Sequence, residues 1–326
     1  MPASPAAETV KLLIVGSGAA GLTAAIYAAR ANLEPLLVEG LQPGGQMTST
    51  SDGENYPGFA DVIQGPWLME QMHKQAEHVG ARFLADSVVD VDLGRRPFKV
   101  TCDSGKVFLA EGLVIATGAR ARWLGLPSEQ HFNGRGVSAC ATCDGFFYRN
   151  KDVAVVGGGN TAVEEALYLA QICSSVTLIH RRDSLRAEKI GQERLFRHPK
   201  VKVIWDSVVE EVLGGSGQFD GVTGLKLKNL KSGGTSEIAV EGLFVAIGHD
   251  PATAVFKGKV EMDEEGYILA APNSTRTSVP GVFAAGDCVD KVYRQAVTAA
   301  GMGCMAALEA DKWLAAEADR EAQAAE

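Results

Sequence analysis

The chain has 326 residues, which is more than one ordinary domain needs and suggests two. Hydrophobic residues make up 46% and charged residues 22%, the usual balance of a globular protein with full cores. The formal net charge of −9 argues against sequence-independent nucleic-acid binding, because such binding needs Lys and Arg side chains facing phosphate.

The cysteine content and the N-terminal segment indicate the compartment. Six cysteines are too sparse for a disulfide-stapled secreted scaffold. Residues 1–16 show no basic region followed by an apolar one and a cleavage site. Since the chain also has no apolar run of about 18 residues, we expect a cytoplasmic protein that does not span a membrane.

The first predicted elements are a strand, a tight glycine turn, a helix and a second strand. Residues 11–15 form a short apolar run that Gly16 ends, residues 23–31 are Ala-rich and helical, and residues 35–38 are again strand-like. A similar unit recurs over residues 151–183. Strands that alternate with helices predict an α/β architecture built on parallel sheets.

A second pattern also occurs twice and indicates a duplicated design. Residues 111–118 and 241–248 both run from an acid and a glycine through an apolar stretch to a final glycine. Each follows a glycine turn by about a hundred residues (118 − 16 = 102 and 248 − 157 = 91). The repeats predict two dinucleotide-binding domains, each opened by a glycine turn and closed by a strand that ends in glycine.

The remaining 78 residues (326 − 248) are few for a third domain and contain no glycine fingerprint. They include a strand-like segment over 281–287 and an Ala-rich helix over about 295–316, so we expect them to complete the first domain. The predicted fold is α/β, with two Rossmann-like, three-layer β/β/α dinucleotide-binding domains, the second inserted into the first. The predicted boundaries are residues 1–121 with 250–326 for the first domain and residues 122–249 for the second.

The two glycine turns are the predicted nucleotide sites. GSGAAG at 16–21 and GGGNTA at 157–162 each lie between a strand and a helix, the context in which this motif is informative. The glycines permit the turn and let backbone N–H groups approach a pyrophosphate. A glycine-rich turn without a ligand is the alternative, and the flanking strand and helix argue against it.

The residue at the end of the next strand distinguishes the two sites. Eighteen residues after the first turn stands Glu39, and at the same distance after the second stands His180, followed by Arg181 and Arg182. A carboxylate accepts hydrogen bonds from ribose hydroxyls and repels a 2′-phosphate, whereas arginines bind that phosphate. We therefore expect FAD or NAD at the first site and NADPH at the second, where Arg186 can reach the same phosphate. A solvated basic turn is the plainer interpretation of these arginines. Two dinucleotide sites in one chain indicate a flavoprotein.

CATC at 140–143 allows three interpretations. Zinc needs about four ligands, and neither the other cysteines nor the histidines have a matching spacing, so we expect no metal site. A structural disulfide between residues three apart closes almost no loop and stabilises little. Redox exchange remains, because a vicinal pair forms a reversible bridge. Asp144 then stands where it could exchange a proton with a released thiolate, although an ordinary turn aspartate is an equal alternative.

Over essentially its whole length the sequence resembles the low-molecular-weight, bacterial-type thioredoxin reductases. The matching motifs are GSGAAG at 16–21, GGQ at 44–46, ENYPGF at 54–59, ATG at 116–118, CATCDG at 140–145, GGGNTAVEEA at 157–166, HRRDSLRAEK at 180–189, AAGD at 284–287 and RQA at 294–296. The glutathione-reductase branch instead has a CxxxxC near the first glycine motif, which is absent here.

The resemblance implies a role for each matched residue. FAD would be held by Gly16, Ser17, Gly18, Ala20, Gly21, Glu39, Gly45, Gln46, Asn55, Thr117, Gly118, Gly286, Asp287, Arg294, Gln295 and Ala296. NADPH would be held by Gly157, Gly159, Asn160, Thr161, Ala162, His180, Arg181, Arg182 and Arg186. Cys143 would face the flavin, Cys140 would attack the thioredoxin disulfide, and Asp144 would be the acid/base. The resemblance also implies a homodimer, and domain rotation between the two half-reactions.

The sequence therefore predicts an NADPH-dependent flavoprotein that reduces oxidised thioredoxin through Cys140 and Cys143. One alternative is the flavoprotein reductase of a peroxide-reducing system. That type has an N-terminal module with a second CxxC, whereas here we expect only a nine-residue polar tail, residues 1–9, ahead of the first strand. A reductase of another thioredoxin-like protein and a non-catalytic redox sensor that binds dinucleotides are further alternatives.

Overall fold

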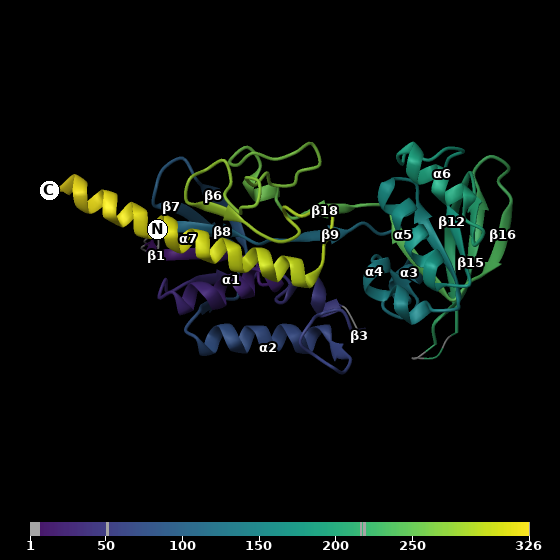
Figure 1. Cartoon of the computed structure of the whole chain (residues 1–326), viewed down its shortest axis with the longest axis horizontal. Coiled ribbons are helices and arrows are strands. Elements are labelled where there is room, and N and C mark those ends of the chain that lie inside the picture. The colour runs from purple at the N-terminus through teal and green to yellow at the C-terminus, as the bar shows by residue number, and fades with distance from the viewer. Residues whose placement is uncertain (1–6, 50–51, 216, 218–219, 326) are drawn as a thin grey trace. The chain divides into compact units, whose positions relative to one another are not determined.

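The chain divides by its contacts into two compact units. The computed structural model describes residues 7–49, 52–215, 217 and 220–325. Unit 1 is Met1–Arg120 with Asp250–Glu326, and unit 2 is Ala121–His249. The purple N-terminal and yellow C-terminal parts of the chain in Figure 1 thus belong to one unit. The chain leaves unit 1 along β9 (Ala119–Ala121) and returns along β18 (His249–Pro251), and these two strands pair with each other.

Unit 1 is built on a seven-stranded sheet. Its strand β1 (Glu8–Val15) pairs in parallel with β2 (Leu36–Val38) on one side and with β8 (Val107–Ile115) on the other. The strand order therefore reverses at β1, and ligands of open α/β sheets bind beyond the carboxyl ends of strands at such a reversal. The remaining strands are β5 (Arg82–Leu84), β6 (Val88–Asp92), β7 (Phe98–Cys102) and β19 (Val282–Ala284).

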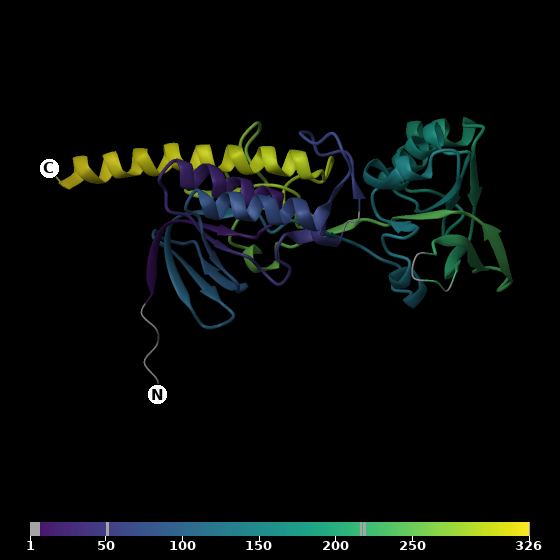
Figure 2. The same cartoon turned by 90° about the horizontal axis from the view of Figure 1, so that it is seen from below.

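Three helices cover one face of this sheet. α1 (Ala19–Arg30), α2 (Gly65–His78) and α7 (Ala296–Ala325) lie side by side in Figures 1 and 2 and bury a core rich in alanine. α1 begins four residues before the predicted helix, because the helix starts directly after Gly18. α7 extends past the predicted end at 316, since the residues that follow are mostly alanine and charged helix formers.

A second apolar core lies on the opposite face of the same sheet. It contains residues of β6 and β7, of η3 (Ala254–Phe256) and of the segment that follows η3, with Phe256 and Ile268 each 1% exposed. The short elements η1 (Gly45–Ser49), β3 (Asp52–Gly53) and β4 (Ile63–Gln64) lie between β2 and α2 in sequence. The C-terminal segment contributes β19 and α7 to unit 1.

Unit 2 repeats the design with a five-stranded parallel sheet. β11 (Asp152–Gly157) pairs with β12 (Ser175–Ile179) on one side and with β17 (Gly242–Ala246) on the other, so the strand order reverses here too. The outer strands are β10 (Val137–Ser138) and β13 (Val201–Ile204).

Helices and a second sheet complete the layers of unit 2. The helices are α3 (Pro127–His131), α4 (Ala141–Asp144), α5 (Asn160–Ile172) and α6 (Lys189–Arg197), with η2 (Gly145–Tyr148) after α4. The antiparallel strands are β14 (Ser207–Gly214), β15 (Val222–Asn229) and β16 (Thr235–Ala239). One core lies between the parallel sheet and the helices, and another lies between the two sheets. The predicted α/β class with two Rossmann-like domains is confirmed.

No helix among the described residues combines the length and the apolar character that a membrane span requires.

Candidate active site

The first glycine turn is a tight bend that leaves its outer side open. Gly16, directly after β1, has φ of +106°, and a Cβ on Gly21 would collide with the carbonyl oxygen of Gly16. By contrast, no atom lies within 4 Å of the position that a Cβ on Gly18 would occupy. α1 begins just after Gly18, which has no side chain to accept the N–H groups of the first helical turn. Ala20, in the first turn of α1, is buried and has no polar side chain. The hydrogen-bond donors at this helix start are therefore backbone N–H groups, which suit a phosphate.

Glu39 follows β2 next to this turn and has an unexpected neighbour. Ser17 joins the two segments, because its hydroxyl donates to the Glu39 carbonyl at 2.9 Å and accepts the N–H of Gly44 at 3.0 Å. The Glu39 side chain is only 12% exposed, and the Nε2 atom of His73 on α2 lies 3.4 Å from its Oε1. His73 in turn stacks on Phe83, with ring centroids 3.9 Å apart. Nothing in the sequence pairs His73 with Glu39, since 34 residues separate them (73 − 39).

The loops predicted to contact FAD gather around the same turn. A Cβ on Gly45 would lie 3.4 Å from the Cα of Gly18, so this loop approaches the first turn closely. The side-chain amide of Gln46 donates to the carbonyl of Ala119, and the Nδ2 of Asn55 donates to the Oε1 of Gln295 at 3.3 Å. Segments far apart in sequence are therefore joined within unit 1.

Two largely shielded polar side chains, Thr117 and Asp287, follow β8 and β19. The Oγ1 of Thr117 is buried and has no hydrogen-bond partner among the described residues. Gly118 follows it with φ of +69°. The pKa of Asp287 is raised to about 6, mainly by burial and also by the negative charge of Asp290, while the positive charge of Arg294 opposes the rise. A buried hydroxyl without a partner beside a carboxyl with a raised pKa fits a polar ligand that would complete the hydrogen bonds.

The start of α7 lies next to these groups. Asp290 accepts the N–H groups of Val292, Tyr293 and Arg294 at 2.9, 2.9 and 3.0 Å, which holds the loop before the helix. Arg294 has φ of +47°, and α7 begins at Ala296. Gly286 approaches the start of α1, because a Cβ on Gly286 would lie 2.9 Å from the Cβ of Ala20.

The second glycine turn has the same form in unit 2. The place of a Cβ on Gly159 is open, with no atom within 4 Å, and α5 begins at the next residue, Asn160. Ala162 is fully buried against Gly157, so a small residue is needed there as well. Thr161, the second residue of α5, is partly exposed.

The loop after β12 is tied to this turn by its backbone. Arg186 donates its N–H to the carbonyl of Gly158 at 2.7 Å, and the Oδ1 of Asn160 accepts the N–H of Glu188 at 2.7 Å. The side chains of Arg181, Arg182 and Arg186 are exposed, and none forms a salt bridge with another residue that the structure describes. Three unpaired guanidinium groups beside a phosphate-type turn fit a second phosphate.

His180 differs from the arginines that follow it. Its side chain is buried beneath the glycine turn, with Nδ1 2.8 Å from the carbonyl oxygen of Gly157. Because a carbonyl can only accept, Nδ1 bears the proton of this hydrogen bond. A Cβ on Gly158 would collide with the imidazole ring, so the histidine shapes the turn from below. Its buried Nε2 has no hydrogen-bond partner among the described residues.

The cysteine pair forms a disulfide on a short helix of unit 2. Cys140 and Cys143 are bonded, and the Sγ of Cys140 accepts the N–H of Cys143 at 3.2 Å as the cap of α4. Asp144 ends this helix, and its N–H donates to the carbonyl of Cys140 at 3.1 Å. Phe146 and Phe147 follow in η2 and are 55% and 37% exposed, so the pair has an apolar surface beside it.

Asp144 has a partner that the sequence analysis missed. The hydroxyl of Ser138, at the end of β10, donates to the Oδ2 of Asp144 at 2.6 Å. Burial raises the pKa of Asp144, and the hydrogen bond from Ser138 opposes that rise. Burial also raises the pKa of Tyr148 to about 12, assisted by the negative charge of Asp144, so this phenol stays neutral. Ser138 stands two residues before the CxxC motif, and no sequence pattern marks it.

The other four cysteines are apart from this chemistry. Cys102, Cys173 and Cys288 are buried, and burial raises the pKa of each thiol to about 11, which makes them unreactive. Cys304 on α7 is partly exposed and also free. Within the described ranges no group of three or more His, Cys, Asp or Glu side chains could hold a metal ion.

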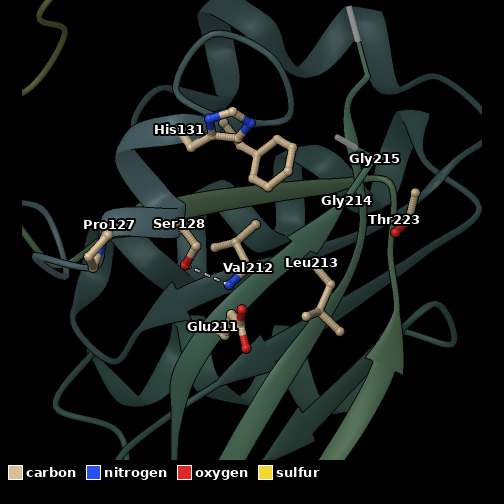
Figure 3. Close-up of a pocket in the computed structure, with 10 residues that line it drawn as sticks. Pro127, Ser128, His131, Glu211, Val212, Leu213, Gly214, Gly215 and Thr223 are labelled. Atoms are coloured by element: carbon tan, nitrogen blue, oxygen red, sulfur yellow. Dashed lines mark hydrogen bonds between the residues drawn. The ribbon is translucent and has the colours of Figure 1, made fainter. Parts of the chain in front are cut away.

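A hollow of about 480 Å³ lies elsewhere in unit 2 (Figure 3). It lies between α3 and the end of β14, where the hydroxyl of Ser128 accepts the N–H of Val212 at 3.0 Å. None of the predicted site residues lines it, and its wall includes His131 and Glu211 without an arrangement that indicates a reaction.

With this geometry established, comparison with known proteins decides the family. Residues 10–303 match the family model described as pyridine nucleotide-disulphide oxidoreductase. The chain belongs to that family. Its relatives there are thioredoxin reductases: the one from Rickettsia bellii is 61% identical over 306 residues, with 94% of this chain and 98% of the relative covered. The one from Coxiella burnetii is 57% identical over 310 residues, with 93% and 96% covered.

Solved structures of this family agree. The thioredoxin reductase from Giardia duodenalis has a TM-score of 0.90 and 46% identity, with 94% of this chain and 99% of that chain covered. The thioredoxin reductase from Streptococcus pyogenes has a TM-score of 0.89 and 42% identity, with 95% and 100% covered. The predicted membership in the bacterial-type thioredoxin reductases is confirmed.

Proposed function

We propose that this chain is an NADPH-dependent flavoprotein disulfide reductase that reduces oxidised thioredoxin. The observation that carries the proposal is the Cys140–Cys143 disulfide beside the half-buried Asp144 carboxyl, in a chain with two dinucleotide-type turns. The relatives named thioredoxin reductase support it.

Unit 1 supplies the FAD site. The open turn at Gly18 offers backbone N–H groups to the pyrophosphate, and Glu39 accepts from ribose hydroxyls. Asp287 and the unpaired hydroxyl of Thr117 would complete their hydrogen bonds with the bound cofactor. We assign residues 1–121 with 250–326 to an FAD-binding domain, and the boundary at Arg120 supports this division.

Unit 2 supplies the NADPH site. The turn at 157–162 receives the pyrophosphate, and the exposed Arg181, Arg182 and Arg186 receive the 2′-phosphate. We assign residues 122–249 to this NADPH-binding domain, which also contains the cysteine pair. Because β9 and β18 are the two crossings between the units, we propose that the domains turn about this strand pair between half-reactions.

When held at the two glycine turns, FAD and NADPH would supply the electron pair that reduces the Cys140–Cys143 disulfide. The sulfur released from that bond needs a proton to become a thiol, and Asp144 supplies it from a carboxyl whose raised pKa favours the protonated form. The Cys140 thiolate then attacks the thioredoxin disulfide to form a mixed disulfide. Cys143 attacks the sulfur of Cys140, so the enzyme disulfide re-forms and thioredoxin leaves with two thiols.

The partner would meet the apolar surface beside the pair. Phe146 and Phe147 directly follow the motif and expose their rings, as aromatic anchors of protein interfaces do. We further propose a homodimer in the cytoplasm, which family resemblance supports.

Reconstitution and cysteine variants test the function. The purified protein should be yellow with bound flavin and should reduce an aromatic disulfide reagent when given NADPH and thioredoxin. Cys143→Ser and Cys140→Ser should lose thioredoxin reduction but keep NADPH-driven bleaching of the flavin, whereas Cys304→Ser should behave like the wild type. Full turnover by Cys143→Ser would exclude the assignment of the pair.

Cofactor preference tests the second site. Each charge-assisted hydrogen bond contributes about 1.5–3 kcal/mol, so replacing Arg181 and Arg182 by alanine should raise the KM for NADPH at least about tenfold. The KM for NADH should change little. Arg197→Ala removes an exposed guanidinium of α6 and is the matched control. An unchanged ratio of the two KM values in the double variant would contradict the site assignment.

A further inference from the structure

Ser138 connects the two ends of the redox motif through one buried hydroxyl. The residue is 6% exposed at the end of β10. Its Oγ donates to the Oδ2 of Asp144 at 2.6 Å and accepts the N–H of Cys140 at 3.0 Å. The carbonyl oxygen of Cys140 lies 3.4 Å from the same Oγ, so the hydroxyl has a second acceptor within reach.

This arrangement satisfies both charge states of Asp144. A hydroxyl has one donor and two acceptor positions. When Asp144 is a carboxylate, the Ser138 hydroxyl donates to Oδ2 and accepts from the Cys140 N–H. When Oδ2 is protonated, the carboxyl donates to Oγ, and the hydroxyl turns its proton toward the Cys140 carbonyl. No buried polar group loses its partner in either state.

We propose that Ser138 is a positioning residue for the reaction, which holds the Asp144 carboxyl in place through both protonation states by turning its hydroxyl between Asp144 and the Cys140 carbonyl. The inference rests on the proposed function, because it assigns a task to Ser138 in the proton transfer of thiol–disulfide exchange. In that step one proton moves from the Asp144 carboxyl to a cysteine thiolate, which leaves a carboxylate and a neutral thiol.

The surroundings leave Ser138 as the main polar control on this carboxyl. Burial and the Ser138 hydrogen bond are the two influences on the Asp144 pKa. The phenol of Tyr148 in η2 interacts electrostatically with Asp144 and stays neutral, since its own pKa is raised to about 12. α5, which packs on this helix, presents Leu169, Ile172 and the ring of Tyr168 toward Gly145. Removing the hydroxyl therefore removes the influence that lowers the Asp144 pKa.

The test compares Ser138→Ala with a variant that loses a similar bond elsewhere. Ser175 Oγ donates to Asp152 Oδ1 at 2.6 Å at the amino-terminal ends of β12 and β11, the opposite edge from the glycine turn. In the holoenzyme, Ser138→Ala should lower the rate of thioredoxin reduction about tenfold at neutral pH, a fraction of a typical acid–base contribution. In the pH–rate profile of Ser138→Ala, the limb that reports the titration of Asp144 should move to higher pH. Ser175→Ala should keep the wild-type profile. NADPH-driven flavin bleaching should be unchanged in both.

Three further measurements separate the possible causes. Alkylation of the NADPH-reduced protein by iodoacetamide, followed against pH, should show the same upward shift without thioredoxin, so it tests Ser138 even if thioredoxin is not the substrate. Ser138→Thr, which keeps a hydroxyl, should restore the wild-type pH profile. In an Asp144→Asn background the Ser138→Ala change should have no further effect on rate.

Several outcomes would overturn the assignment. The assignment fails if Ser138→Ala keeps the wild-type pH profiles of both turnover and alkylation. It also fails if the rate losses of Ser138→Ala and Asp144→Asn add in the double variant. If Ser138→Ala does not fold, the unmutated protein still decides the matter. With 13C-carbonyl cysteine, the amide I band of Cys140 should shift in step with protonation of Asp144, and a band that stays constant would refute the turning hydroxyl.

Discussion

Glu129 provides a quantitative test of how unit 2 begins. Its side chain is 1% exposed, and its two carboxyl oxygens accept three backbone N–H groups: Leu124 at 2.8 Å, Gly125 at 2.8 Å and Leu126 at 3.3 Å. These residues follow β9, so one side chain holds the segment by which the chain enters the unit. Glu129→Gln keeps one acceptor oxygen and turns an amide N–H₂ toward a backbone donor.

The expected loss follows from these contacts. A hydrogen bond to a charged group contributes about 1.5–3 kcal/mol, and glutamine loses at least one of the three, so we expect a destabilisation of at least about 1.5–3 kcal/mol. For a unit of this size that lowers the midpoint of thermal unfolding by roughly 10 °C. Glu129→Ala, which removes all three acceptors, should be less stable still.

Thermal unfolding followed by circular dichroism is the assay, and an exposed glutamate is the matched control. Glu193 on α6 is 62% exposed and lies 3.7 Å from Arg197, so Glu193→Gln should shift the midpoint by less than about 2 °C. A Glu129→Gln midpoint within about 2 °C of the wild type would refute the reasoning. An alanine variant more stable than the glutamine variant would refute it as well.

Three other changes test separate parts of the structure. Gly158→Ala should abolish NADPH binding measured by calorimetry while flavin content stays normal, because the added methyl group collides with the His180 ring; retained affinity would contradict this geometry. In protein stripped of flavin, Asp287 has a pKa of about 6 against an ordinary 3.8, so the folded state binds this proton more tightly than the unfolded state does. The free energy of unfolding, measured with urea, should therefore fall as the pH rises from about 3.8 to about 6. Asp287→Asn should remove that slope, and an identical slope in the variant would exclude Asp287 as its source. The guanidinium of Arg96 lies 2.9 Å from the carboxylate of Glu111 and 3.0 Å from that of Glu317 on α7. Arg96→Ala should therefore speed amide hydrogen exchange in the last turns of α7. Unchanged exchange there would show that these ion pairs do not stabilise the helix end.

The sequence determined the features that depend on local backbone geometry. A glycine turn between a strand and a helix can be recognised from residues 16–21 alone, because the close approach of Gly21 to Gly16 tolerates no side chain. The α/β class followed from short apolar runs that alternate with helical segments, and both glycine turns lie where the strand order reverses. The CxxC motif is local for the same reason, since its disulfide joins residues on one helical turn.

Only the tertiary structure decided which groups share a site and which are buried. The sequence left Asp144 equally open to a turn or an acid/base role, and its burial beside Ser138 now distinguishes it from a solvated turn aspartate. His73 beside Glu39 and the clamp of Glu129 were likewise absent from any motif. Hydrogen bonds between distant segments, and the desolvation that shifts a pKa, arise only when the chain has packed, so no window of neighbouring residues contains them.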